Sequence, residues 1–335
     1  MTCTGEPKLV YNTVGERSRS IMTRIGLPAA ILGLLAASPA LAEPSVPPPE
    51  NVIVTATKLQ DQIHSFVQSY AAPSPAIGKL ARWRDPICPV AAGMSDALAA
   101  TVVKRVRQIA AMVGAPVGSS SCHGNIDIVF TYSPQILLND VRAHHPVLLG
   151  YHDVAQETDL ATVRHTVQSW YATQTADVGG SREVDDKQTH AYTQMSIYVP
   201  NGYQRGSLQT SVPVEFDVPA QTKLVTGNHM SDGLSSELFH VIVTVNASKI
   251  GDGQIAGITD YVAMLALAQT TAFETCRGMS SATGIVTDNC PTTSQSITIA
   301  DLAYLRALYK TDPARNLAQR RDDIADEMDK ALSPH

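Results

Sequence analysis

The feature that most constrains this chain is the stretch AGITDYVAMLALAQT, residues 256–270, whose apolar side chains would occupy every side of a helix. A surface helix is apolar along one stripe, whereas a helix that is apolar all round has to be covered on all sides. We therefore predict a buried core helix over residues 257–271. The run before it, LFHVIVTVNASKI at 238–250, is rich in β-branched residues and predicts a strand, which the turn GDGQ joins to the helix.

The rest of the chain is large enough to cover such a helix. It has 335 residues, of which 44% are hydrophobic, and its mean hydropathy is -0.03. These values are typical of a globular protein with one large or two small domains. Aromatic residues make up only 5% of the chain, so we expect the core to consist mainly of aliphatic side chains.

Apolar periodicity and alternation predict the other elements. Thr298 and Asp301 form a capping box at the start of TIADLAYLRALY, and NIDIVFTY alternates as a half-buried strand does. Helices and strands interleaved in this way predict an α+β fold with a sheet packed on helices. The helices are expected at 63–71, 95–114, 133–145 and 298–309, and the strands within 79–93, 125–132, 165–175 and 190–203.

The first 42 residues are expected to be a secretory signal peptide with an upstream extension. From Met22 the sequence has a basic residue, a short apolar run and a small-x-small cleavage site that ends at Ala42. The apolar run is shorter than the ~20 residues that a membrane-spanning helix needs. We therefore expect a mature chain that starts at Glu43, has no membrane span and is periplasmic or secreted.

Three further segments are predicted after the signal peptide. Residues 43–61 form a proline-rich linker, 62–312 the α+β domain, and 313–335 a charged and largely solvated C-terminal helix. Within the linker, ENVIVTATK at 50–58 resembles the TonB box of outer-membrane receptors. An extended segment of this kind would offer a strand to the sheet of an envelope partner. The alternative is a strand-like linker or an edge strand of the domain itself.

Four cysteines remain after the predicted cleavage, and they permit three pairings. We favour Cys88–Cys122 and Cys276–Cys290, because each pair brackets one local unit and closes a short loop. A four-cysteine zinc site is the alternative, but no pair has the C-x-x-C spacing that such sites usually show. The cysteines thus agree with export to an oxidising compartment.

The charge of the chain argues against nucleic acid as a partner. Residues 1–42 hold four basic and two acidic residues, so the remainder has 21 Lys+Arg and 29 Asp+Glu, a net charge of -8. Basic residues gather only at 104–108 and 315–321, and acidic residues follow the second group directly. Nucleic-acid binding depends on a concentrated positive patch, which this sequence does not show.

Several stretches together resemble a known family. They are LARWRDPI, the helix expected at 95–114, CHGNIDIVF, SWYAT, the core helix and TIADLAYLRALY. In these the chain resembles an uncharacterised family of exported proteobacterial proteins, which is itself similar to zincin-like metallopeptidases. The resemblance covers residues 78–312 and implies a zincin-like mixed sheet packed on helices, with the last helix as an extension.

In zincins the central helix carries two histidines at i and i+4, with a glutamate beside the first. Here Asp260 and Met264 stand at the histidine positions and Tyr261 stands at that of the base. Methionine is a poor ligand for hydrolytic zinc, and the ordinary pKa of tyrosine, about 10, is too high for a base. As a residue of the first turn, Asp260 would contribute chiefly through the helix dipole.

We therefore predict a non-catalytic binding or interaction module, without a cofactor or metal and with an unknown ligand. Asp260, Tyr261 and Met264, together with His240 and Glu237 from the preceding strand region, are the candidates to line a cleft. A metal-dependent hydrolase with atypical ligands is one alternative; its metal would be held by Asp260 or by the group His144, His145 and His152. A TonB-linked accessory protein is the other alternative.

Overall fold

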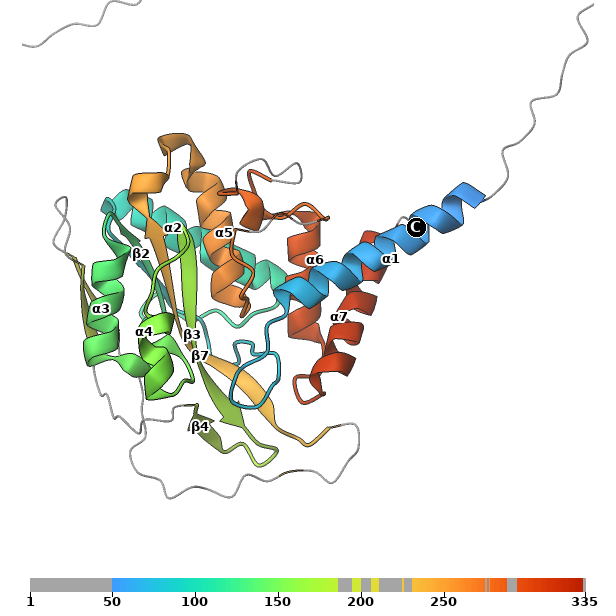
Figure 1. Ribbon diagram of the computed structural model, residues 1–335, viewed down its shortest axis with the longest axis horizontal. Coiled ribbons are helices and arrows are strands. Elements are labelled where there is room, and N and C mark those ends of the chain that lie inside the picture. The colour runs from blue at the N-terminus through green and yellow to red at the C-terminus, as the bar shows by residue number, and fades with distance from the viewer. Residues whose placement is uncertain are drawn as a thin grey trace, which may run out of the picture. The chain divides into compact units, whose positions relative to one another are not determined.

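The fold is built around one mixed sheet (Figure 1). The computed structural model describes residues 50–185, 195–199, 206–210, 225, 231–274, 276, 278–287 and 294–333. The signal peptide expected at 1–42 and the first residues of the expected linker lie outside them. No helix in this described part is both long and apolar enough to cross a membrane.

Five strands form the sheet in the order β1-β2-β7-β3-β4. The first three run parallel, and β3 is antiparallel to both β7 and β4, so the predicted α+β fold with a mixed sheet is confirmed. A separate hairpin pairs β5 with β6. The strands are β1 Pro89–Ala92, β2 Ile126–Thr131, β3 Val167–Ala176, β4 Arg182–Val184, β5 Met195–Val199, β6 Gly206–Thr210 and β7 Ser235–Asn246.

The helices lie on both sides of the sheet, with α3 and α4 on one side and α2 and α5 on the other (Figure 1). This covering corrects the expectation of a half-buried β2: every residue of this strand is buried, as is usual for a parallel strand with both faces covered. The helices are α1 Glu50–Tyr70, α2 Asp96–Val113, α3 Pro134–His144, α4 Glu157–Leu160, α5 Ile255–Leu267, α6 Ile299–Lys310 and α7 Leu317–Leu332.

The two faces of the sheet differ in chemistry. We call the side that meets α2 and α5 the apolar face; it carries Ile126 and Ile128 of β2 and Val241, Val243 and Val245 of β7. The opposite side, here the mixed face, carries apolar residues that pack on α3 and the 3₁₀ turn Pro146–Leu149. It also carries buried polar and charged residues, namely Asp127, Gln174, Glu237, His240 and Thr244.

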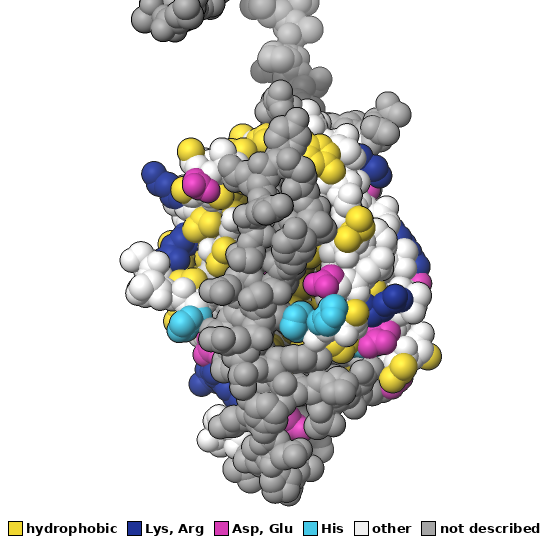
Figure 2. Space-filling model, turned by 90° about the vertical axis from the view of Figure 1, so that its left-hand side faces the viewer, with side chains coloured by type: hydrophobic (Ala, Val, Ile, Leu, Met, Phe, Trp, Pro, Cys, Tyr) yellow, Lys and Arg dark blue, Asp and Glu magenta, His cyan; other side chains and the backbone are white. Residues whose placement is uncertain are grey.

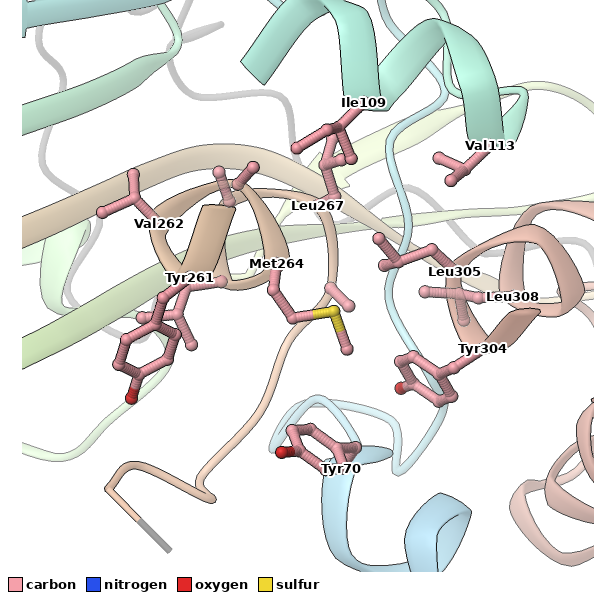
Figure 3. Packing of buried hydrophobic residues seen from close by; sticks show 14 of the residues in the cluster. Tyr70, Ile109, Val113, Tyr261, Val262, Met264, Leu267, Tyr304, Leu305 and Leu308 are labelled. Carbon is pink, nitrogen blue, oxygen red and sulfur yellow. The ribbon is translucent and has the colours of Figure 1, made fainter. Parts of the chain in front are cut away.

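The predicted core helix is α5, and all residues from Gly257 to Leu267 are buried. Met264 lies among side chains of other helices, including Tyr70 of α1 and Tyr304 of α6 (Figure 3). This helix therefore confirms the inference that an all-round apolar stretch is buried. Its C-terminus comes at Leu267, earlier than predicted, and Ala268 is extended.

The first helix corrects the expectation for residues 50–58. They form the N-terminal turns of α1 rather than an extended segment, and the folded unit begins well before residue 62. Further along α1, the side chains of Ile63, Phe66, Val67 and Tyr70 are buried on one stripe. Extending an existing packed helix by a further turn costs little free energy, because the helix is already nucleated. The small loss of helix propensity that β-branched residues bring is therefore not enough to prevent it.

The capping box at the start of α6 is confirmed. Thr298 Oγ1 accepts from the Asp301 N–H at 3.0 Å, and Asp301 accepts from the Thr298 N–H at 3.0 Å. Asp301 is fully buried and also accepts from Ser281 Oγ at 2.6 Å and from the Ala282 N–H at 2.9 Å. The cap therefore also ties the preceding loop to α6.

The last helix corrects the expectation of a solvated extension. In α7, Ile324, Ala325 and Met328 are part of the same core as α5 and α6. Arg320 is buried as well, and donates to the carbonyl oxygens of Leu80 at 2.7 Å and Leu308 at 3.1 Å. Because most residues of this helix are charged or polar, the sequence did not reveal its narrow buried stripe.

A second arginine supports the same junction. Arg82 donates to the carbonyl oxygens of Tyr309 at 2.5 Å and Thr311 at 3.1 Å, where α6 ends. The last carbonyls of a helix have no partner within the helix and carry partial negative charge. Arg82 and Arg320 thus fix the α6 C-terminus with backbone oxygens as their acceptors.

Candidate functional site

Asp260, in the second turn of α5, is held by an ion pair. It is 3% exposed and accepts from Arg105 of α2 through both oxygens, at 2.5 Å from Nε and 2.9 Å from Nη2. The Ile297 N–H donates to it at 2.9 Å, and the hydrogen bond from Arg105 raises the pKa of that guanidinium. The role expected for Asp260, a helix-dipole residue, is therefore wrong, because its carboxylate is fully committed to two other segments.

The two neighbours of Asp260 in the motif lie in the core. Tyr261 is 0% exposed, and its hydroxyl accepts from the Glu274 N–H at 3.3 Å. Burial raises the pKa of Tyr261, which takes it further from the range of a general base. Met264 is 1% exposed and contributes only packing (Figure 3).

His240 lies on the mixed face and pairs with a residue that the sequence did not single out. Its Nε2 is 3.0 Å from Oδ2 of Asp127 on the neighbouring strand β2, and both side chains are at most 2% exposed. Oδ1 of Asp127 has no hydrogen-bond partner among the described residues. The signal for this pair was a lone carboxylate in the apolar strand sequence IDIVF, which is costly to bury without a partner.

Glu237 lies on the same face, near the start of β7, and is 3% exposed. Its carboxylate accepts from Arg182 Nε at 3.1 Å, Arg84 Nη1 at 3.3 Å and Gln174 Nε2 at 3.0 Å. Arg182 also binds Asp85 at 2.8 Å. This network joins β3, β4 and β7 to the segment before β1.

The structure does not bring the five candidate residues to one site. Asp260, Tyr261 and Met264 lie in α5, on the apolar side of the sheet, whereas His240 and Glu237 point to the mixed face. Their exposed fractions are all 3% or less. The expected common cleft is therefore wrong for these residues.

The histidines of the alternative metal site do not converge either. His144 is an exposed residue whose Nδ1 is 3.0 Å from Asp140 Oδ1 in the same helix. His152 is buried, and its Nδ1 contacts the Gly150 carbonyl oxygen. Over the residues that the structure describes, no three side chains of His, Cys, Asp or Glu are grouped so that they could hold a metal ion.

The first predicted disulfide, Cys88–Cys122, is present. Cys276 is also disulfide-bonded. Cys290, its expected partner, lies outside the described residues, so this second pairing stays a prediction. One closed bond and a second bonded cysteine fit an oxidising compartment.

A shallow groove of about 180 Å³ lies beside α1. Phe66 and Met279 give it apolar surface, and Lys58, Asp61 and Gln62 are among its polar residues. None of the five candidate residues lines it.

Figure 2 shows the side of the molecule that lies at the left of Figure 1. Among the described residues visible there, hydrophobic, charged and histidine side chains are interspersed. Two large apolar side chains near the start of α3, Tyr132 and Ile136, are 55% and 54% exposed. Single exposed apolar residues of this kind are common; these two, four positions apart, are the candidates for a contact with a partner that the test below uses.

Comparison with known proteins gives no relative. No protein-family model, no curated protein and no solved structure matches the chain.

Proposed function

We propose that this protein is an exported, non-catalytic binding or interaction module. The observation that carries the proposal is the burial of all five candidate residues, since a side chain that is at most 3% exposed does not touch a substrate from solution. The export part rests on the Cys88–Cys122 disulfide, because such bonds persist in the periplasm and outside the cell.

The zincin-like resemblance keeps a structural meaning in this proposal. A central helix, which in an active zincin holds the metal, here holds the core together through Met264 and the ion pair of Asp260. A scaffold in which the reactive positions have become packing residues retains its surface for binding. The partner is then a protein of the envelope, and any contact through residues 50–58 uses a helix rather than an added strand.

The test combines a search for activity with a search for a partner. Purified mature protein is dialysed, analysed for bound metal and assayed with unfolded casein. Separately, a photo-crosslinking residue replaces Tyr132 or Ile136 in cells, with Lys104 of α2, which is also exposed, as the control position. We expect no stoichiometric metal, no hydrolysis, and a discrete crosslinked product from positions 132 or 136 but not 104.

Stoichiometric zinc together with hydrolysis that Asp260→Asn or His240→Gln abolishes would overturn the non-catalytic proposal. Crosslinking that is equally diffuse at all three positions would remove the contact surface. N-terminal sequencing tests export independently: a mature chain that begins at Glu43 supports it, and an uncleaved chain contradicts it.

A further inference from the structure

The two sulfurs of the Cys88–Cys122 disulfide have different surroundings. Cys88 is 6% exposed, and its N–H donates to Asn125 Oδ1 at 2.7 Å just before β1. Cys122 is partly exposed and lies in a loop whose neighbours Ser121 and His123 are exposed. A reagent in solution therefore approaches the bond from the Cys122 side.

A fixed cation lies against the more accessible sulfur. Arg107 of α2 places Nη1 3.8 Å from Cys122 Sγ, while its Nη2 donates to the Gly118 carbonyl oxygen. Among the described residues, no carboxylate forms an ion pair with Arg107. A positive, partly exposed environment is the setting in which cysteine sulfurs react.

The inner side of this sulfur is blocked by backbone. A Cβ atom added at Gly118 would lie 2.9 Å from Cys122 Sγ and 3.1 Å from the Ile87 carbonyl oxygen. Gly118 therefore packs directly on the sulfur, and its absence of a side chain permits the close approach. Since Cys122 is itself partly exposed, we expect a thiolate to approach from the solvent side.

We propose that Cys122 is a site of thiol–disulfide exchange with an external thiolate, and that Arg107 assists the attack. The thiolate sulfur forms a bond to Cys122 Sγ, the Cys122–Cys88 bond breaks, and its electron pair leaves on Cys88 Sγ, which can take a proton from water. The product is a mixed disulfide on Cys122. Negative charge is spread over three sulfurs during this step, and the Arg107 guanidinium lies beside the central one.

We expect the fold to survive this step, because hydrogen bonds also join the two segments. In the disulfide-bonded protein the Gly118 N–H donates to the Ile87 carbonyl oxygen at 3.0 Å, and the Asn125 N–H donates to that of Cys88 at 3.1 Å. These bonds hold the start of β1 beside the loop without the covalent link. The Cys88 thiol therefore stays close to Cys122 and can attack the mixed disulfide to re-form the original bond.

The experiment uses the native, oxidised mature protein with two probes: reduced glutathione, and thioredoxin whose resolving cysteine is replaced by serine. After acid quenching and alkylation, peptide mass spectrometry locates the modified and the freed cysteine, with the Cys276 peptide followed separately. We expect the probe on Cys122 and the alkyl group on Cys88. Adduct with glutathione alone indicates a small thiol as the natural partner, and adduct with thioredoxin indicates an oxidoreductase.

Arg107→Gln should slow adduct formation about fivefold, the effect of one charge at about 4 Å in a watery environment. Arg142→Gln on α3, whose guanidinium donates to Thr158, is the charge-matched control and should leave the rate unchanged. High salt should narrow the difference in rate between wild type and Arg107→Gln, because it screens exposed charges. The position of the probe on the wild-type protein needs no variant and so tests the proposal even if Arg107→Gln misfolds. A probe found on Cys88, or equal rates for wild type and a folded Arg107→Gln, overturns the proposal.

Discussion

The two faces of the central sheet are buried in different ways, one by apolar packing and the other by pairing of polar and charged side chains. On the apolar face, valines and isoleucines of β2 and β7 pack on α2 and α5, and shape decides what fits. On the mixed face, Asp127, Glu237 and His240 are buried just as deeply, and each needs a partner on another strand. The comparison shows that one face tolerates change in polarity poorly, whereas the other tolerates loss of a specific partner poorly.

The largest effect is expected on the apolar side. Met264→Ala should lower the free energy of unfolding by about 2–5 kcal/mol, because it leaves a cavity among the side chains of α1, α5 and α6. Urea unfolding measures it, with Ile299→Ala as the control, since Ile299 is 72% exposed. A loss no larger than that of the control would mean that Met264 is not part of a tight core.

Glu237 gives the counterpart on the mixed face. Glu237→Ala should cost about 1–3 kcal/mol, because Gln174, Arg182 and Arg84 lose an acceptor. The cost stays below that of a fully buried ion pair, since the Arg84 side chain is 61% exposed and turns to water. Asp322→Ala, an exposed carboxylate of α7, should be close to neutral in the same measurement.

Two adjacent residues of β7 provide the sharpest contrast between the faces. Val243 is fully buried on the apolar face, and Val243→Thr should destabilise by about 1–3 kcal/mol by burying a hydroxyl. Thr244 faces the other side, and its Oγ1 is buried without a hydrogen-bond partner among the described residues. Thr244→Val should therefore stabilise the protein by about 1 kcal/mol. If both substitutions shift the urea midpoint in the same direction, the distinction between the faces fails.

The smallest effect is expected in how the free energy of unfolding changes with pH. Burial raises the pKa of Asp301 above its ordinary value of 3.8. The folded protein then holds this proton more tightly than the unfolded chain, so the contribution of Asp301 is fully present below the unfolded pKa and is lost as pH rises through the folded one. Urea midpoints measured from pH 3.5 upward should show this loss of stability for the wild type and a smaller loss for Asp301→Asn. Asp322→Asn should show the same dependence on pH as the wild type.

Local features of the sequence predicted most elements. The helices α2, α3 and α6 follow from apolar periodicity, Pro134 and the Thr298 capping box, because these signals act within a few residues. The helical form of residues 50–58 was not predicted, since their β-branched residues indicate a strand. That preference for extended structure is only weak and local. The packing of the turns that follow in α1 decides the outcome.

The partners of the candidate residues were beyond local inference. Asp260 and Arg105 are 155 residues apart, and His240 and Asp127 are 113 apart. Only the strand order and the placement of α2 beside α5 bring these groups together. The sequence could identify a charge in an apolar segment, but not which distant residue neutralises it.

The acceptors of Arg82 and Arg320 affect how the contacts between α6 and α7 respond to acid. Both guanidinium groups bind backbone carbonyl oxygens at the end of α6, and a peptide oxygen keeps its character across the whole range in which carboxylates lose their charge. Acid therefore leaves these two arginine contacts in place, although it weakens the ion pair between Lys310 of α6 and Glu327 of α7. The backbone acceptors thus keep part of the docking of the C-terminal helix independent of pH.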